Sequence, residues 1–476
     1  MTGSLPIAVI GAGPVGLAAA AHLLARDLVP LVLERGAGAG TSLKAWGHVR
    51  MFSPWRYNID EAARALLEET DWSAPNPEAL PLGGEIVRRY LEPLAGHPAL
   101  ARHLRFEAEV TAITRHGLDK MASEGRADAP FEIRWRDTGG GKHRSLARAV
   151  IDASGTWTQP NPMGVDGLLV TGELAAAAHV EYGIPDVLGA RRDTYAGRRV
   201  LVVGSGHSAI NVVLDLLRLE ETAPGTRVTW ALRRNRLDKL LGGGLNDALP
   251  ARGALGLAAT RAIAAGRLDV LAPFAAERVV IGADGLEVSG RLDAMSWAGH
   301  FDRIVVATGL RPDLNLLREV RVALDPAVEA PPALAPLIDP NLHSCGTVPP
   351  HGAAELAHPE PGFYIVGSKS YGRAPTFLMA TGYEQVRSIA AEIAGDHDAA
   401  KRVHLVLPET GVCSAAPVAA GASGCCGGPA PESPTAPDAE VCCADDALAK
   451  AEGKDGCGCG TQDPPASTIP CCGAAA

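Results

Sequence analysis

Cysteine is missing from most of this chain. The sequence has 476 residues and ten cysteines, none of which precedes Cys345 and nine of which lie from Cys413 onward. A secreted fold that is cross-linked by disulfides has its cysteines distributed through the core. The distribution therefore predicts a reduced, cytoplasmic body that carries a thiol-rich appendage. It also excludes a redox-active cysteine pair built into the body before Cys345.

An excess of positive charge and long apolar runs are also lacking. The net charge is −10 at pH 7, which argues against a nucleic-acid partner, because nucleic acids select basic surfaces. No apolar run reaches the roughly 20 residues that a membrane-spanning helix needs, so we expect no membrane insertion. With 47% hydrophobic residues, the chain can bury the cores of two or three domains.

A complete dinucleotide-binding pattern stands at residues 7–34. An apolar strand meets the turn GAGPVG, an alanine- and leucine-rich helix follows, and a second apolar strand ends on Glu34. In this pattern Gly11 makes the tight turn, Gly13 lets backbone N–H groups approach a pyrophosphate, and Gly16 lets the helix pack close to the strand. The helix N-terminus adds a dipole that favours phosphate. Glu34 can accept hydrogen bonds from ribose hydroxyls and would repel a 2′-phosphate.

A second pattern of the same kind spans residues 199–214. Its strand runs into the turn GSGHSA, in which alanine takes the third glycine position, a permitted variant. The next strand, at 227–232, ends in Arg233 and Arg234 rather than in an acid. Guanidinium groups pair with phosphate oxygens, so this pair favours a 2′-phosphate, the alternative being a solvated basic turn. His207, inside the turn, is interpreted as structural or as facing the pyrophosphate.

The two patterns imply two different nucleotides. Glu34 suits the unphosphorylated ribose of FAD, whereas the arginine pair suits NADPH rather than NADH. Two dinucleotide sites in one chain imply electron transfer from a nicotinamide to a flavin. The expected cofactors are therefore FAD and NADPH.

Three further residues are candidates near the flavin. The segment at 46–60 has no clear period and contains Arg56 and Asn58. We interpret it as a loop over the flavin ring, the alternative being a surface loop with buried tryptophans. The segment 374–393 predicts a helix that contains Thr381, and its N-terminus either points its dipole at the flavin pyrimidine or only covers the core. Other expected elements are a helix at 84–94 and strands at 105–113, 131–136 and 149–155.

The order of these motifs resembles a known class of flavoproteins. Besides the two fingerprints, the chain has the small-residue turns DASG at 152–155 and ATG at 307–309 and a terminal GFYIVG at 362–367. Over roughly residues 5 to 398 it is similar to flavoproteins with two dinucleotide-binding domains, and most similar to single-component flavin-containing monooxygenases. The resemblance implies FAD in the first domain and NADPH in an inserted second domain. It also implies that reduced flavin and molecular oxygen oxygenate a soft heteroatom or a carbonyl of a small molecule.

The expected architecture is α/β, with two Rossmann-like dinucleotide-binding domains and a disordered C-terminal tail. The FAD-binding domain is expected at 1–165 and 301–400, the inserted NAD(P)H-binding domain at 166–300, and the tail at 408–476. The expected assembly is a homodimer.

In many relatives an acid that holds the ribitol follows the last strand glycine, where this chain has Ser368. The expected cofactor-binding residues are Gly11, Gly13, Pro14, Gly16, Glu34, Arg35, Val110, Gly155, Gly204, Gly206, His207, Ser208, Arg233, Arg234, Gly309 and Gly367.

The tail is rich in alanine, glycine, proline and cysteine, and it has too few large apolar side chains to bury a core. Its paired cysteines favour dithiols, because a vicinal disulfide strains the peptide between them. Soft thiolates prefer soft ions such as trivalent arsenic, mercury or copper(I); zinc, or a tail with no role, is the alternative. The arrangement resembles the C-terminal cysteines of mercuric reductase and flavoprotein monooxygenase-like proteins associated with arsenic resistance. The candidate ligands are Cys425, Cys426, Cys442, Cys443, Cys457, Cys459, Cys471 and Cys472.

Three functions are consistent with these patterns. The first is an FAD- and NADPH-dependent monooxygenase-like enzyme that acts on a metalloid or another heteroatom, with Arg56, Asn58 and Thr381 near the flavin. The second is an NADPH-dependent reductase in which the tail thiols act as shuttle or substrate. The third is a soft-metal-binding protein on a flavoprotein scaffold with little turnover.

Overall fold

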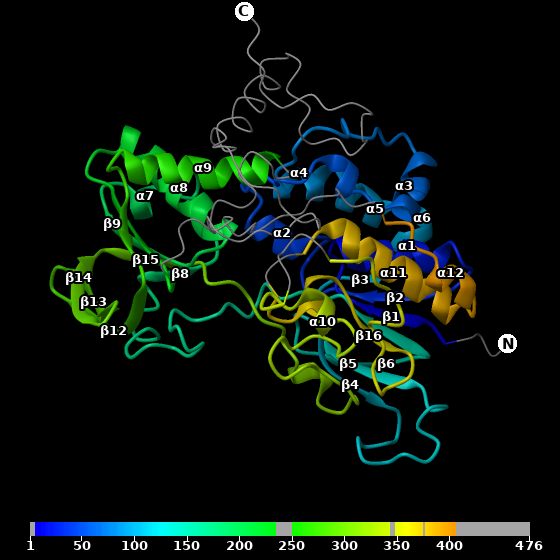
Figure 1. The fold of residues 1–476 in the computed structure, drawn as a ribbon. Helices are drawn as coiled ribbons and strands as arrows, with labels where there is room; N and C mark the ends of the chain where they lie inside the picture. The colour runs from blue at the N-terminus through cyan, green and yellow to red at the C-terminus, as the bar shows by residue number, and fades with distance from the viewer. Residues whose placement is uncertain (1–4, 235–249, 343–347, 375–376, 406–476) are drawn as a thin grey trace, which may run out of the picture. The chain divides into compact units, whose positions relative to one another are not determined.

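The computed structural model describes residues 5–234, 250–342, 348–374 and 377–405 (Figure 1). The chain divides into a compact unit, Met1–Ala415, and a second unit, Ala416–Ala476. The second unit lies outside the described residues, as does the whole tail expected from residue 408. Within the described ranges, every helix is too short or too polar to span a bilayer.

The first fingerprint lies in a parallel five-stranded sheet. Its strands, in spatial order, are β16 (Phe363–Ile365), β7 (Ala149–Asp152), β1 (Ile7–Ile10), β2 (Pro30–Leu33) and β3 (Leu104–Arg105). Strands that are covered on both faces have continuous apolar sequences, as β1 does and as β7 does up to its last residue, Asp152. Helix α1 (Pro14–Leu24) connects β1 to β2, and α11 (Met379–Ile393) packs against α1 (Figure 1).

The second fingerprint builds the same arrangement again. The strands, in spatial order, are β8 (Val180–Tyr182), β15 (Arg303–Val306), β9 (Arg199–Val203), β10 (Arg227–Ala231) and β11 (Asp269–Leu271). Helix α8 (His207–Thr222) connects β9 to β10, and α9 (Pro250–Ala264) precedes β11. Because β15 pairs with β9 and β8, this sheet continues to Val306, past the boundary at residue 300 drawn from the sequence.

Each parallel sheet is accompanied by an antiparallel meander of three strands. In the first domain these are β4 (Glu109–Arg115), β5 (Phe131–Arg136) and β6 (Lys142–Ala147), which precede β7. In the second they are β12 (Phe274–Gly282), β13 (Gly285–Leu292) and β14 (Met295–Phe301), which precede β15. The expected α/β class with two Rossmann-like domains is thereby confirmed.

The helix expected at 84–94 forms as three consecutive pieces, α4 (Gly83–Ile86), a π-helical turn η2 (Val87–Leu91) and α5 (Glu92–Gly96). Pro93 explains the π turn. Its ring nitrogen carries no proton, so it cannot donate to the carbonyl of Arg89 as a helix requires. The Trp72 indole takes over and donates to that oxygen at 2.7 Å. The sequence period therefore predicted the helix but not the break in its hydrogen bonding.

The helix expected at 374–393 begins later, at Met379, as α11. The remaining helical elements are short. They are α2 (Thr41–Ala45), η1 (Trp55–Tyr57), α3 (Glu61–Glu68), α6 (Pro98–Ala101), α7 (Arg192–Tyr195), η5 (Asn315–Leu317), α10 (Ala335–Ile338), η6 (Gly367–Tyr371) and α12 (His397–Lys401).

A buried cluster of charges ties the first meander to the chain that leads into β16. Glu360 accepts hydrogen bonds from Arg115 Nε at 2.8 Å and from Arg126 Nη2 at 2.6 Å. The three residues are 1%, 2% and 4% exposed. Burial alone would raise the pKa of Glu360, but the hydrogen bonds from Arg126 and Arg115 hold that pKa below its ordinary value. The carboxylate is therefore the charge that allows two guanidinium groups to be buried.

Replacing Glu360 by glutamine is expected to lower the free energy of unfolding by about 3–5 kcal/mol, because two buried guanidinium groups would lose their counter-charge. Urea denaturation of the full chain measures this. The control is Glu68→Gln, which breaks the exposed Arg64–Glu68 pair and is expected to cost less than about 1 kcal/mol. Equal losses in the two variants would contradict a structural role for the buried cluster.

Candidate functional site

The glycines of the first fingerprint differ in what surrounds them. A Cβ on Gly11 (φ +99°) would lie 2.8 Å from the Ala153 carbonyl oxygen, and one on Gly16 would lie 2.0 Å from that of Gly11. These two positions must therefore be glycine for α1 to approach the sheet. A Cβ on Gly13 would meet nothing within 4 Å. The space in front of the α1 N-terminus, where Gly13 is the N-cap and Pro14 the first helical residue, is thus open and suits a pyrophosphate.

Glu34 is held rigidly beside this turn. It follows β2 directly and is buried, and its carboxylate accepts hydrogen bonds from the backbone N–H groups of Ala12 at 2.8 Å and Gly36 at 2.7 Å. A carboxylate has about four acceptor positions, so two remain for ribose hydroxyls. Arg35 is exposed directly after it, and Val110 is half-buried on β4.

The second fingerprint repeats the steric pattern. Gly204 has φ +138°, and its Cβ would lie 2.2 Å from the Ala307 carbonyl oxygen, whereas a Cβ on Gly206 would meet nothing within 4 Å. His207 and Ser208 form the first turn of α8, so their backbone N–H groups point out of the helix N-terminus. The open space again lies where a pyrophosphate would bind.

Arg233 and Arg234 follow β10 and are both exposed. They begin one residue beyond the position that Glu34 occupies after β2, which after β10 is occupied by Leu232. The two domains therefore present an acid and a basic pair at equivalent strand ends.

The three residues expected near the flavin have different environments. Asn58 is fully buried, and its side-chain amide donates to the carbonyl oxygens of Ser53 at 2.8 Å and Pro54 at 2.9 Å, so it shapes the loop. Arg56 is exposed and forms an ion pair with Glu78. Thr381 is buried in the first turn of α11. The loop at 46–60 is thus internally braced.

Two further contacts anchor this loop to helices α11 and α1. The Tyr383 hydroxyl on α11 donates to the Asn58 carbonyl oxygen at 2.8 Å. Asp60 caps α3 by accepting from the Ala63 N–H, and its other oxygen lies 2.9 Å from His22 Nε2 on α1. The loop therefore has a fixed position relative to α1 and α11.

The turns after β7 and β16 meet at the same sheet edge. Gly155 (φ +69°) and Gly367 (φ +68°) both adopt left-handed conformations, and a Cβ on Gly155 would lie 3.9 Å from the Ser368 hydroxyl. The Gly367 N–H donates to the Gln385 side chain at 2.7 Å. Between these turns lies a buried ion pair that sequence reasoning missed, Lys369 with Asp152 at 2.7 Å. Asp152 belongs to the DASG turn, but no motif marks Lys369.

The two chain segments that run between the sheets lie side by side. The Asn161 N–H donates to the Gly309 carbonyl oxygen at 2.9 Å, the Thr308 hydroxyl donates to the Asn161 carbonyl at 2.8 Å, and Arg311 Nε donates to the Asn161 side chain at 2.8 Å. Gly309 has φ +95°, a conformation that favours glycine. Gly309 therefore helps to join the two chain segments that run between the sheets.

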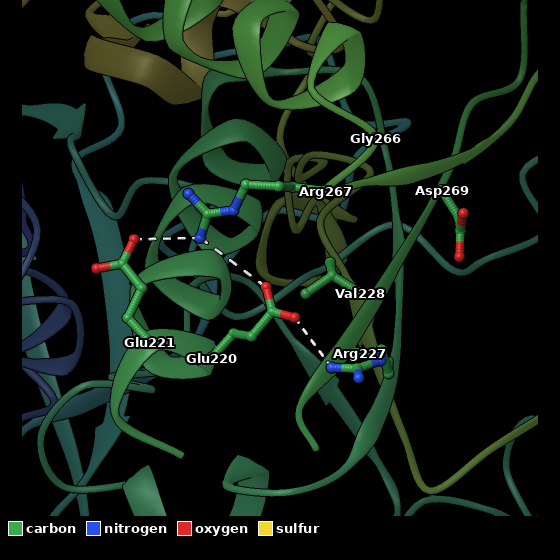
Figure 2. A pocket seen from close by; sticks show the side chains of 7 residues that line it. All are labelled: Glu220, Glu221, Arg227, Val228, Gly266, Arg267 and Asp269. Atoms are coloured by element: carbon green, nitrogen blue, oxygen red, sulfur yellow. Dashed lines mark hydrogen bonds and ion pairs between the residues drawn. The ribbon is translucent and has the colours of Figure 1, made fainter. Parts of the chain in front are cut away.

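A separate hollow of about 650 Å³ lies at the amino edge of the second sheet, around Arg227, Asp269 and Arg267 (Figure 2). Figure 2 shows Glu220 between the two arginines, with Arg227 Nη1 at 2.9 Å and Arg267 Nη2 at 3.9 Å from its oxygens. The glycine turn lies at the opposite, carboxyl edge, where open α/β sheets bind ligands. The hollow is therefore a surface ion-pair network outside the dinucleotide site.

The eight tail cysteines expected to bind a metal lie outside the described residues, as does Cys345. Within the described part of the chain, no cluster of three or more histidine, cysteine or acidic side chains is arranged to hold a metal ion.

Two parallel sheets, each with an open glycine turn at its carboxyl edge, define an oxidoreductase with one flavin and one nicotinamide dinucleotide domain. Residues 8–332 match the family described as pyridine nucleotide-disulphide oxidoreductase, and the chain belongs to this family. Membership confirms the expected cofactors, FAD and NADPH.

Curated relatives agree with the similarity to flavin monooxygenases. The chain is 29% identical over 262 residues to a Baeyer-Villiger monooxygenase of Streptomyces coelicolor, covering 52% of this chain and 42% of that protein. It is 27% identical over 241 residues to the N-oxide-forming dimethylaniline monooxygenase 4 of Oryctolagus cuniculus, covering 48% and 40%. The chain thus spans about two fifths of the length of these relatives.

Solved structures share the fold. The bacillithiol disulfide reductase Bdr of Bacillus cereus has a TM-score of 0.58 at 18% identity, covering 82% of this chain and 99% of that one. The cadaverine monooxygenase DfoA of Erwinia amylovora, solved with FAD, has a TM-score of 0.58 at 12% identity, covering 87% and 100%. At these identities the likeness concerns architecture.

Alanine at Gly13 and at Gly16 should separate binding from folding. Gly13→Ala is expected to cost less than about 1 kcal/mol of stability, since the added methyl meets open space, but to weaken FAD binding at least about tenfold by occupying the pyrophosphate position. Gly16→Ala should lower stability by more than about 3 kcal/mol through its clash with Gly11. Thermal unfolding of the apoprotein and fluorescence titration with FAD measure the two effects.

The matched control in the second domain is Gly206→Ala, which should weaken NADPH binding while the bound FAD content stays unchanged. Loss of FAD from this variant, or normal FAD binding by Gly13→Ala, would contradict the assignment of the two turns.

Proposed function

We propose that this chain is an FAD-dependent, NADPH-using oxidoreductase of monooxygenase type that oxygenates a heteroatom or metalloid substrate with molecular oxygen. The observation that carries the proposal is the pair of open glycine turns on two separate parallel sheets, in a body that has no cysteine before Cys345. Disulfide reductases of this architecture need a cysteine pair beside the flavin, which this body lacks. The similarity to curated monooxygenases supports the same choice.

The chain's own residues would bind and orient the two nucleotides. The turn from Gly11 to Gly16 and the α1 N-terminus would hold the FAD pyrophosphate, with Glu34 on a ribose. The turn at Gly204 and Gly206 would hold the NADPH pyrophosphate. FAD bound there would supply the redox chemistry, which is hydride acceptance from the nicotinamide and electron transfer to oxygen. The braced loop at 46–60, fixed between α1 and α11, would exclude water on one side of the site.

A second function is favoured by the paired cysteines of the tail. In that function the enzyme is a reductase, and a vicinal dithiol such as Cys425 with Cys426 binds a soft metal or metalloid and exchanges electrons with the flavin. Soft thiolates select such ions. The tail would also be compatible with a separate sequestering role beside the monooxygenase reaction.

Arg233→Ala combined with Arg234→Ala is expected to raise KM for NADPH by at least about tenfold, because charge-assisted hydrogen bonds to the 2′-phosphate are lost. KM for NADH should stay unchanged, since NADH has no such phosphate. Steady-state NAD(P)H oxidation measures both. Equal changes for the two nucleotides would show that the arginines act on folding or on a shared part of the cofactor.

Reacting the NADPH-reduced full chain with oxygen discriminates the candidate functions. In a monooxygenase, hydrogen peroxide should appear only seconds after oxygen has reacted with the reduced flavin. A thioether or trivalent arsenical that is present should incorporate one atom of ¹⁸O from labelled oxygen. Immediate, stoichiometric hydrogen peroxide with no label in any substrate would contradict this proposal.

The tail is tested in the same assay by replacing its eight paired cysteines with serine, with Cys345→Ser as the control. Unchanged NADPH oxidation in the eight-serine variant would support the monooxygenase. It would mean that the tail cysteines serve a purpose separate from this reaction. Loss of NADPH oxidation in this variant, but not in the control, would favour the reductase.

A further inference from the structure

A fully buried lysine lies at the carboxyl edge of the first sheet. Lys369 belongs to η6, directly after β16, and Asp152 is the last residue of the neighbouring strand β7. Lys369 Nζ donates to Asp152 Oδ2 at 2.7 Å, and the two residues are 1% and 0% exposed. Because both side chains are fully buried, neither can touch a bound cofactor directly.

The pair does contact an exposed residue at this carboxyl edge of the sheet. Ser154, two residues after Asp152, is exposed, and a Cβ on Gly11 would lie 3.2 Å from its Cα. Ser154 therefore lies beside the tight turn of the first fingerprint. Its Oγ donates to Asp152 Oδ1 at 2.6 Å and accepts from Lys369 Nζ at 3.0 Å.

These two hydrogen bonds determine which donor and acceptor positions of the Ser154 hydroxyl remain for a ligand. A hydroxyl has one proton to donate and two lone pairs to accept with. The proton is given to Asp152, and one lone pair is taken by Lys369. A single acceptor position is left, on an oxygen that cannot rotate its proton outward without breaking a charge-assisted bond.

We propose that Ser154 is a binding residue of the FAD site that accepts a hydrogen bond from a hydroxyl of the cofactor, and that Lys369 and Asp152 are positioning residues that hold its oxygen as an acceptor. The inference rests on the proposed binding of FAD at the carboxyl edge of the first sheet. Phosphate oxygens only accept hydrogen bonds at neutral pH, so they do not match this position. The ribityl and ribose hydroxyls of FAD can donate, and they do match.

The assignment also accounts for Ser368. Where relatives of this architecture place a ribitol-holding acid after the last strand glycine, this chain has Ser368, whose hydroxyl is the rival candidate for the same role. The acid of this chain is instead Asp152, buried one strand away, and it would act on the cofactor through Ser154.

The test is FAD binding by the full chain after removal of its flavin, followed by quenching of flavin fluorescence, with thermal unfolding of the apoprotein measured alongside. Ser154→Ala should weaken FAD binding by about threefold to tenfold, the range of one net hydrogen bond. It should also lower apoprotein stability somewhat, because Lys369 Nζ loses one of its hydrogen-bond partners. Ser154→Thr, which keeps the hydroxyl, should restore most of the affinity. Ser368→Ala is the matched serine deletion, and a larger loss there than in Ser154→Ala would overturn the proposal.

The positioning role is tested by combining substitutions. Lys369→Met should weaken FAD binding when Ser154 is present and should have no further effect on FAD binding in the Ser154→Ala background, because Lys369 would act only through that hydroxyl. Equal effects in both backgrounds would overturn the role of Lys369. Arg126→Met is the control for buried charge: it breaks a similarly buried ion pair in the meander, and it should lower stability without weakening FAD binding.

Two partial ligands identify the donor. FMN carries the ribityl hydroxyls without the adenosine, and ADP carries the adenosine ribose without the ribityl chain. Weaker binding of FMN alone to Ser154→Ala assigns the ribityl chain, and weaker binding of ADP alone assigns the ribose. If the native chain binds FAD and Ser154→Ala binds FAD, FMN and ADP as tightly, this inference fails on its own; if the native chain binds no FAD, the proposed function fails first.

Discussion

The close approach of helix α1 to the sheet is the constraint on which the first domain depends. It is possible only because Gly16 has no side chain, since a methyl group there would lie 2.0 Å from the Gly11 carbonyl oxygen. Once α1 is seated, it positions other parts of the site. His22 on its far turn meets Asp60 and thereby fixes the end of the 46–60 loop. Gly382 allows α11 to reach the first turn of α1, where a side chain would meet Val15 at 2.6 Å.

The two dinucleotide domains share this steric plan but differ in charge. Glu34 is buried and is held by two backbone N–H groups, which fixes a negative charge at the end of β2. The equivalent end of β10 carries two exposed arginines that can adjust to a phosphate. Glycines thus provide what all dinucleotides require, and the residues after the second strand distinguish one ribose from another.

The features that could be predicted from the sequence are those whose determining residues lie within about thirty positions of one another. Both fingerprints are of this kind. The Lys369–Asp152 pair joins residues 217 positions apart, and the Tyr383–Asn58 bond joins residues 325 apart, so no local period marks either. Asn58 was expected near the flavin because it lies in a polar loop. Its burial and its bonds to Ser53 and Pro54 depend on how that loop folds back, which periodicity does not encode.

The strand orders of the two sheets have a consequence for how the chain can be divided. Strands β1 to β7 and β9 to β15 are two copies of one plan, each followed by one more strand, β8 and β16 respectively. Each of these final strands pairs with the other copy: β8 lies beside β15, and β16 lies beside β7. The copies have therefore exchanged their last strands within a single polypeptide. Cutting the chain between them would leave both sheets one strand short, so neither half of the chain holds all the strands of its own sheet.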